Sequence, residues 1–170
     1  MWPGRGLISY PIGSSRQRLS FSDAVLEHFW RHRQRRPWAL EAGGQLFGRL
    51  LGDVVEISEA TGPRPRDVRT PWSYAPYRAD EQAEIEDWHN AGLIFVGDWH
   101  THWQMRPRPS AQDRINVGDI ARRMRHHMNG VVLVIVGYAR HPSGLFVSIA
   151  ENQDLHELTP EVLAEARRRN

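Results

Sequence analysis

Two histidines and an aspartate have the residue types and the spacing of a metal site. His100 and His102 end an apolar stretch and are separated by one residue. Residues two apart on a β-strand project from the same face, about 6.5–7 Å apart along the chain, so both imidazoles point in one direction. Asp113 follows after a proline-containing loop, in the first turn of a predicted helix. Three such ligands leave a fourth position open on zinc, which is the arrangement of a catalytic rather than a structural site.

Two further residues could serve that chemistry, although each has a simpler interpretation. Ser110 precedes Asp113 by three residues, and a serine with an acid at this distance also forms a capping box at the start of a helix. Glu41 lies just before Gly43 and Gly44, where an isolated acid is usually a surface charge. A lone His-x-His pair is likewise more often solvated or packed than bound to a metal. Taken one by one, these features leave both interpretations open.

The composition limits which other chemistry is available. The chain has 170 residues, of which 40% are hydrophobic and 25% charged, as in an ordinary globular domain. It has no cysteine, which excludes disulfides, cysteine-ligated zinc, iron–sulfur clusters and thiol catalysis. No apolar run approaches the ~18–20 residues of a membrane span, and the first residues do not have the pattern of a signal peptide. We therefore expect a cytoplasmic protein with no membrane partner.

The basic residues are all arginine, and they nearly balance the acidic ones. With 22 basic and 20 acidic residues the formal net charge is +2, which gives no general preference for nucleic acid. The arginines within residues 31–36 could contact phosphates, but a solvated helix face or a dock for an acidic partner is the favoured interpretation. His28 and His32 are four residues apart on the same predicted helix, and we expect them on a solvated face rather than on a metal.

The elements that position these residues follow from the pattern of apolar residues, glycines and prolines. Apolar residues at helical spacing predict a helix capped by Ser20 or Ser22, and the Gly-Asp at 52–53 predicts a hairpin of strands over 43–50 and 54–60. The strand predicted over 131–138 is the most apolar and is therefore expected to be central. The other predictions are an arm or edge strand over 1–19, a single domain over 20–170, a loop over 61–77, helices over 79–91, 110–124 and 160–169, and strands over 93–99 and 144–150.

The five candidate residues together form a specific composite motif. It consists of Glu41 before a Gly-Gly pair, His100-x-His102, seven intervening residues and Ser110-x-x-Asp113. In this combination the chain resembles the JAMM (MPN+) family of zinc isopeptidases over roughly residues 39–150, including the Gly-Asp-Trp that precedes the histidines. The resemblance implies an α/β (α+β) domain of the MPN/JAMM, cytidine-deaminase-like type. Its β-sheet would be curved, mixed, largely antiparallel and flanked by helices.

The resemblance also implies a role for each residue of the motif. One Zn²⁺ per chain would be bound by His100, His102 and Asp113. Glu41 would hold the zinc-bound water and act first as general base and then as general acid, and Ser110 would hydrogen-bond the oxyanion. These roles agree with the ordinary chemistry of zinc, which lowers the pKa of a bound water toward ~7.

The chain departs from the family pattern at two places, and its compactness together with the Gly-Asp-Trp-His-Thr-His stretch resembles the compact bacterial members. Trp103 stands where many members have proline, and the cysteine-containing insertion of larger deubiquitinating relatives is missing. The chain is similar to the JAMM proteins encoded beside ubiquitin-like activating and conjugating enzymes in antiphage operons, including cyclic-oligonucleotide signalling (CBASS) systems. Those proteins remove a protein that is conjugated through a C-terminal glycine. The resemblance thus implies a ubiquitin-like or other glycine-terminated substrate, with the operon's activating or conjugating enzyme as a further partner.

Four aromatic residues are candidates for substrate binding. Trp72, Tyr74 and Tyr77 lie in the proline-rich segment, and Trp103 lies beside the metal ligands. They could line a groove for an extended substrate tail, or they could simply pack. Three other functions remain open: a peptidase that matures a ubiquitin-like or sulfur-carrier precursor, an inactive scaffold of MPN type, and, least favoured, a module that binds nucleic acid.

Overall fold

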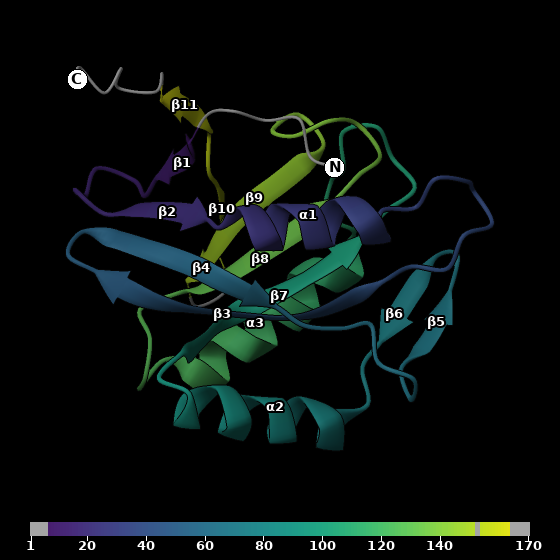
Figure 1. Ribbon diagram of the computed structural model, residues 1–170, viewed down its shortest axis with the longest axis horizontal. Coiled ribbons are helices and arrows are strands. Elements are labelled where there is room, and N and C mark those ends of the chain that lie inside the picture. Colours follow the sequence, from purple (N-terminus) through teal and green to yellow (C-terminus); the bar gives the residue numbers. More distant parts are fainter. Residues whose placement is uncertain (1–6, 152–153, 164–170) are drawn as a thin grey trace.

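The computed structural model describes residues 7–151 and 154–163 of the chain (Figure 1). The helices within these ranges are α1 (Asp23–His32), α2 (Arg78–Asn90) and α3 (Ala111–Met124). The strands are β1 (Leu7–Pro11), β2 (Arg18–Phe21), β3 (Gly43–Leu51), β4 (Val54–Ala60), β5 (Val68–Thr70), β6 (Ser73–Ala75), β7 (Ile94–Thr101), β8 (Val131–Val136), β9 (Leu145–Glu151), β10 (Asp154–Glu157) and β11 (Glu161–Leu163).

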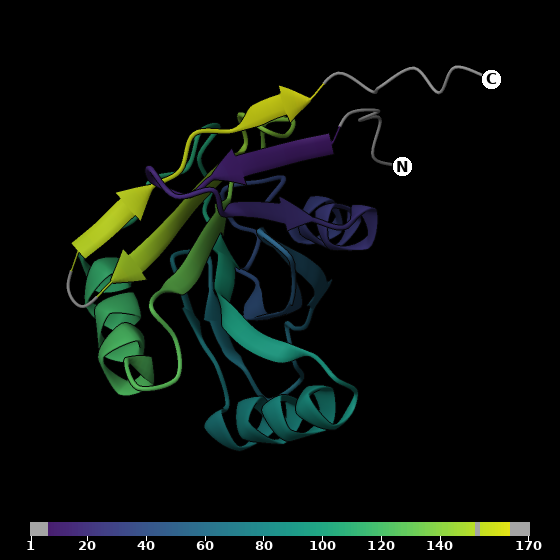
Figure 2. The ribbon, with the colours of Figure 1, turned by 90° about the vertical axis from the view of Figure 1, so that its left-hand side faces the viewer.

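One large mixed sheet dominates the fold. Nine strands are hydrogen-bonded in the order β10-β9-β8-β7-β3-β4-β2-β1-β11, and only the pairs β2–β4 and β7–β8 among them are parallel. β5 and β6 form a separate two-stranded hairpin. Figure 2 shows that the large sheet curls strongly and that α1 and α3 lie on opposite sides of it. The predicted α+β class, with a curved, largely antiparallel sheet flanked by helices, is confirmed.

Strand β8 separates two apolar cores. All six of its residues are buried. Its even-numbered valines join the core that contains the buried face of α1, and its odd-numbered residues join the core beneath α3. This alternation is that of a strand covered on both faces of its sheet. The predicted apolar strand is thus confirmed, although β3, and not β8, is the middle strand of the nine.

Several local predictions are also confirmed by the structure. Helix α1 begins after Ser22, whose side chain accepts a hydrogen bond from the backbone of Val25. The predicted hairpin is β3–β4, with Gly52 at a φ of +60° in its turn, a conformation that favours glycine. Helix α2 begins one residue before the predicted segment, and α3 begins after Ser110 as its N-cap.

Three predictions are wrong where strands pair that the sequence did not indicate. The segment 61–77 is not only loop, because it contains the hairpin of β5 and β6. Residues 7–11 do not form an edge strand, because β1 lies between β2 and β11. The prediction of a terminal helix is wrong over Glu161–Leu163, where the chain forms β11. Most of the remaining predicted segment lies outside the described residues. Pairing with β1 and the ion pair between Arg18 and Glu161 here outweigh the local preference for helix.

No helix in the described part of the chain has the length and apolar character needed to cross a membrane.

Candidate active site

Strand β7 carries the two histidines into a cleft. It lies between β3 and β8, with His100 opposite Gly43 of β3. The strand can approach β8 this closely because residue 97 is glycine: a Cβ there would lie 1.9 Å from the carbonyl oxygen of Val132. The Nε2 atoms of His100 and His102 lie 3.2 Å apart, so the two rings converge as the spacing predicts.

Asp113 closes the group from the first turn of α3. Its Oδ1 lies 3.2 Å from His100 Nε2, and its Oδ2 lies 3.4 Å from His102 Nε2. Burial alone would raise the pKa of Asp113, but hydrogen bonds from His100 and His102 outweigh it and lower the pKa below its usual value. Each residue thus offers one ligand atom within 4.8 Å of the others, which is a donor set that suits zinc.

Ser110 holds the Asp113 carboxylate in place. Both the backbone N–H and the hydroxyl of Ser110 donate to Asp113 Oδ2 at 2.7 Å, and the N–H of Asp113 donates back to the hydroxyl at 3.1 Å. The capping box expected as an alternative is therefore present. It does not compete with a metal site, because Asp113 Oδ1 still faces His100.

Glu41 is a buried acid, so its interpretation as a surface charge is wrong. Only 6% of the residue is exposed. The backbone N–H of Glu41 donates to the carbonyl of Thr70 at 2.8 Å, and the Arg69 guanidinium donates to the backbone carbonyl oxygen of Glu41. Burial raises the pKa of Glu41 to about 7; the nearby His102 opposes this shift and the Asp113 charge adds to it. A carboxyl group with this pKa exchanges a proton readily at neutral pH.

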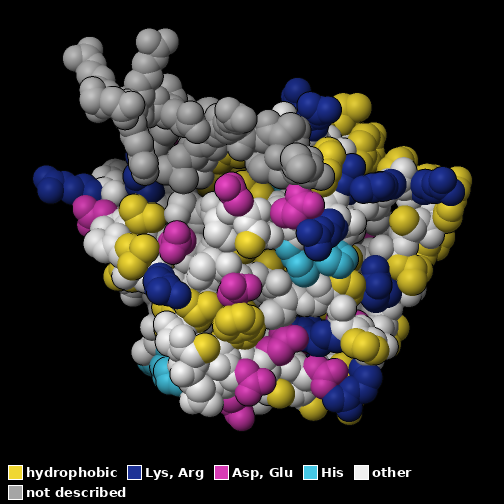
Figure 3. All heavy atoms as spheres, viewed as in Figure 1, with side chains coloured by type: hydrophobic (Ala, Val, Ile, Leu, Met, Phe, Trp, Pro, Cys, Tyr) yellow, Lys and Arg dark blue, Asp and Glu magenta, His cyan; other side chains and the backbone are white. Residues whose placement is uncertain are grey.

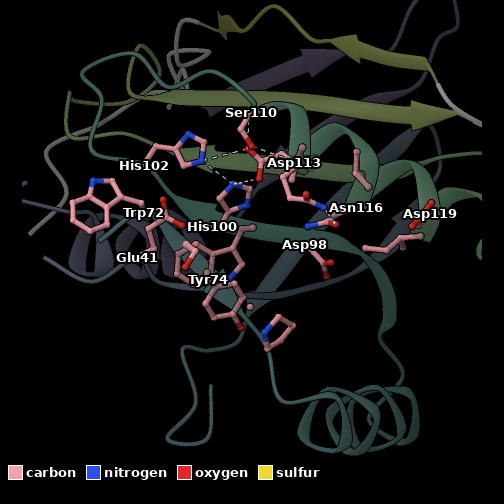
Figure 4. Close-up of a pocket in the computed structure, with 18 of the residues that line it drawn as sticks. Glu41, Trp72, Tyr74, Asp98, His100, His102, Ser110, Asp113, Asn116 and Asp119 are labelled. Carbon is pink, nitrogen blue, oxygen red and sulfur yellow. Dashed lines mark hydrogen bonds and ion pairs between the residues drawn. The ribbon is translucent and has the colours of Figure 1, made fainter. Parts of the chain in front are cut away.

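The candidate residues share one end of a cleft of about 970 Å³. Figure 4 shows Glu41, His100, His102, Ser110 and Asp113 gathered there. The cleft continues along β7 between α2, α3 and the β5–β6 hairpin. Residue Asp98 of β7 pairs with Leu133 of the core beneath α3, so the face of β7 that bears the histidines is the face α3 covers.

Three of the four predicted aromatic residues line the cleft. They are Trp72, Tyr74 and Trp103. Trp103 stacks on Tyr138 with ring centroids 4.5 Å apart. Tyr74 also has a packing role, because its ring occupies the space into which a Cβ on residue 43 would project. Tyr77 is not among the lining residues; its exposed ring instead lies 4.2 Å from the guanidinium carbon of Arg66.

Sequence reasoning missed Asp98, an acid beside the histidines in the cleft. Asp98 shares a face of β7 with His100 and His102, as residues two apart on a strand do. Its Oδ1 is buried and has no hydrogen-bond partner among the described residues. Burial, and then the charge of Glu81, raises the pKa of Asp98 to about 7. The alternation 98, 100, 102 was visible in the sequence and could have revealed it.

The histidine pair on α1 is half-buried rather than solvated. His28 Nε2 lies 2.8 Å from the carbonyl oxygen of Gly62, and the ring packs edge-on against Trp99. His32 Nδ1 lies 2.9 Å from the carbonyl oxygen of His28. Burial, and then the charge of His32, lowers the pKa of His28 to about 4. These carbonyl contacts give both rings a structural role.

The arginine-rich end of α1 lies beside two tryptophans, of which Trp30 is half-buried and Trp38 exposed. The guanidinium carbons of Arg33 and Arg36 lie 3.2 Å and 5.7 Å from the ring centroids of Trp30 and Trp38. In Figure 3, basic and hydrophobic side chains gather at the right of the molecule, where α1 ends and the β5–β6 hairpin lies. The surface is thus mixed rather than a continuous basic stripe of the kind that tracks a phosphate backbone.

Comparison with known proteins gives matches over most of the chain. Residues 22–150 match the family described as prokaryotic homologs of the JAB domain. A CD-NTase/cGAS isopeptidase of Pseudomonas aeruginosa is 32% identical over 132 residues, which cover 76% of this chain and 83% of that protein. A protein of the same name from Vibrio cholerae is 28% identical over 93 residues, covering 53% and 60% respectively. A solution structure from Desulfitobacterium hafniense has the same fold, with a TM-score of 0.59 and 19% identity over 86% of this chain and 91% of that one.

Proposed function

This chain belongs to the family of prokaryotic homologs of the JAB domain, and on that basis we propose that it is a zinc-dependent isopeptidase. It cleaves after the C-terminal glycine of a ubiquitin-like or otherwise conjugated protein and so reverses the conjugation. The relative from Pseudomonas aeruginosa, named as a CD-NTase/cGAS isopeptidase, supports this reaction class and a role in antiphage defence. The observation that carries the proposal is a buried glutamate beside a convergent His-His-Asp group in an open cleft.

The residues present fit one zinc ion. His100 and His102 would bind it through Nε2 and Asp113 through a carboxylate oxygen. The Nδ1 of His102 lies 3.0 Å from the carbonyl of Arg108, which favours a proton on Nδ1 and leaves Nε2 free to bind metal. When bound, zinc supplies an acidified water and polarises the carbonyl to be cleaved.

Glu41 moves the proton in this mechanism. Its carboxylate takes the proton from the attacking water and later delivers it to the leaving amine. A pKa of about 7 makes both transfers accessible near neutral pH. Arg69 and Thr70 hold its backbone, so the carboxyl group is placed before substrate arrives.

Ser110 stabilises the oxyanion of the carbonyl under attack. Its hydroxyl has a single proton, which it donates to Asp113 Oδ2 in this structure. To donate to the oxyanion it must turn away from Asp113. The carboxylate then keeps the hydrogen bond from the Ser110 backbone N–H. Loss of such an oxyanion donor typically costs about 10²–10³-fold in rate.

The cleft suits an extended tail better than a folded domain. Strand β6 lines it through Ser73 and Tyr74, with Trp72 in the turn before it, and β6 pairs only with β5 in the described structure. An extended peptide can add to such an open edge by backbone hydrogen bonds. Trp72 and Trp103 would then contact the substrate near the cut, and the glycine would pass between the metal ligands and Tyr74, which line the same cleft.

A precursor-maturing peptidase is the alternative, since trimming a ubiquitin-like or sulfur-carrier protein after its glycines uses the same groups. An inactive MPN-type scaffold is less well supported, because all five motif residues are present and Glu41 is buried among them. We further propose that the protein acts in the bacterial cytoplasm on products of an operon-encoded activating and conjugating enzyme. Nucleic acid is not a proposed partner.

Elemental analysis combined with a cleavage assay tests the proposal. We expect about one zinc per chain and release of a glycine-terminated protein from a lysine isopeptide bond. Mass spectrometry should place the cut directly after the glycine. Zinc-free protein that takes up none on titration, or a cut after a bulky residue, would contradict the assignment.

A further inference from the structure

Asp98 lies in the cleft without a partner for its charge. It is on the same face of β7 as His100, and Figure 4 shows it between Tyr74 and Asn116 in the cleft beyond the histidines. Its Oδ1 has no hydrogen-bond partner among the described residues. Buried carboxylate oxygens are normally hydrogen-bonded, because an unsatisfied one costs about 1–3 kcal/mol or more.

Two of the opposite charges near Asp98 are already engaged elsewhere. Arg78 forms an ion pair with Glu81 at 2.9 Å. Arg64 binds Glu84 and lies 3.7 Å from Asp67. Glu81 also faces Asp98 and adds a second negative charge beside it. Both arginines are thus committed to other acids, and Arg123, the third cation near Asp98 in the lining of the cleft, forms no ion pair with it among the described residues.

The spacing along β7 places this acid at a defined distance from the reaction centre. Asp98 and His100 are two residues apart, or about 6.5–7 Å along the strand. An extended substrate has the same repeat, so its first and third residues counted back from the cut present their side chains on one face. With the first residue at His100, the third would face Asp98.

We propose that Asp98 forms a specificity subsite for a cationic side chain, lysine or arginine, at the third residue before the cut. This inference rests on the proposed isopeptidase function and deepens it by naming a feature of the substrate tail. The tail runs from the metal ligands past Tyr74 of β6 toward the start of α2. A guanidinium or ammonium group entering there neutralises the Asp98 carboxylate, whose buried Oδ1 turns toward the cleft to accept the hydrogen bond.

Three tail peptides that differ in one side chain test the subsite. Each ends in X-Gly-Gly joined through the last carbonyl to a lysine ε-amine, with X as arginine, its neutral isostere citrulline, or glutamate. With the zinc-loaded protein we expect kcat/KM for arginine to exceed that for citrulline about tenfold, the equivalent of one charge-assisted hydrogen bond. Glutamate should be the poorest substrate.

Variants then assign the preference to Asp98. In Asp98→Asn the arginine-to-citrulline ratio should fall to within about twofold of unity. Asp119→Asn is the matched control, because Asp119 lines the same cleft but is paired with Arg122. It should keep the wild-type ratio.

The outcomes separate the subsite from the function itself. Equal cleavage of all three peptides by the wild-type protein overturns the subsite and leaves the isopeptidase function standing, as does an unchanged ratio in Asp98→Asn. Cleavage of none of the peptides by zinc-loaded protein is a failure of the proposed function. If Asp98→Asn does not fold, the wild-type ratio still decides, because a preference for glutamate or citrulline contradicts an acidic subsite.

Discussion

The hydroxyl of Thr101 accepts a hydrogen bond from the backbone N–H of Ala42 at 2.9 Å. The N–H of Thr101 in turn donates to the carbonyl of Ala42 at 2.8 Å. Thr101 lies between the two histidines, and Ala42 follows Glu41 directly. This reciprocal contact therefore fixes Glu41, the proposed general base, relative to His100 and His102, the proposed metal ligands.

Thr101→Val should loosen that link without removing a ligand. The substitution leaves the buried N–H of Ala42 without its acceptor, which costs about 1–3 kcal/mol of unfolding free energy. We expect zinc content to be retained and kcat to fall more than KM rises, because Glu41 loses its fixed position. Thr159→Val, on an exposed threonine, is the control and should change stability by less than about 0.5 kcal/mol. Wild-type kcat in Thr101→Val would show that this contact does not position the base.

Glu41→Gln should separate catalysis from metal binding. Glutamine keeps the size of the side chain but cannot accept the proton of the attacking water. Zinc content should remain near one per chain while turnover falls by at least about 10²–10⁴-fold. Asp113→Ala removes a ligand and should lose zinc and activity together. Near-normal turnover by zinc-loaded Glu41→Gln would mean that another group moves the proton.

Gly97→Ala should prevent correct folding of the site. Its Cβ would lie 1.9 Å from the Val132 carbonyl, so β7 and β8 would have to separate. We expect a loss of several kcal/mol or insoluble protein, measured by urea unfolding and circular dichroism. Gly92→Ala is the control, because that glycine has φ +82° but open space around it. It should cost only about 1–2 kcal/mol of left-handed backbone strain.

Stability should fall as the pH drops from about 6.5 to about 4. Burial, and then the charge of Arg33, lowers the pKa of His141 to about 4 in the folded protein. Its unfolded value is about 6.5, so the unfolded chain binds the proton first on acidification. The stabilisation is complete above pH 6.5 and is lost progressively toward pH 4, by up to roughly 3 kcal/mol.

Urea unfolding at pH 7, 5.5 and 4.5 measures this effect. His28, whose pKa is also about 4, should contribute in the same direction but less, because it is only partly buried. In His141→Gln the free energy of unfolding should fall less between pH 7 and 4.5 than it does in the wild type. Because the carboxylates titrate in both proteins, their contribution cancels in this comparison. Identical pH curves for the two proteins would refute the assignment to His141.

Local patterns were sufficient to predict the elements that hold the motif. The run into His100 has the apolar character of a buried strand, and Ser110 with Asp113 has the spacing of a helix start; both elements are present. These signals are short-range, since the end of a strand, a loop and a helix cap each depend on a few neighbouring residues. The prediction that Glu41 belongs to the site depended instead on the resemblance of the sequence to a family motif.

Long-range pairing, prolines that obscured a local hairpin, and side-chain contacts account for what the sequence did not predict. Strand β11 exists because it pairs with β1, more than 150 residues earlier in the chain, and nothing within 160–169 indicates that partner. The β5–β6 hairpin was hidden by prolines that usually mark loops. The burial of Glu41 and the missing partner of Asp98 depend on what Arg69, Arg64 and Arg78 contact, and side-chain pairing of this kind is not encoded by spacing.

The capping box of α3 links metal uptake to the order of a helix. Ser110 and Asp113 secure the free N–H groups of the first turn, and the same Asp113 carboxylate is the third candidate ligand. A ligand that binds the folded end and not the frayed end stabilises the folded end by linkage. Backbone amides at the start of α3 should therefore exchange with deuterium more slowly once zinc is added, whereas amides of α1 should not respond. Helix order would then report site occupancy without any substrate.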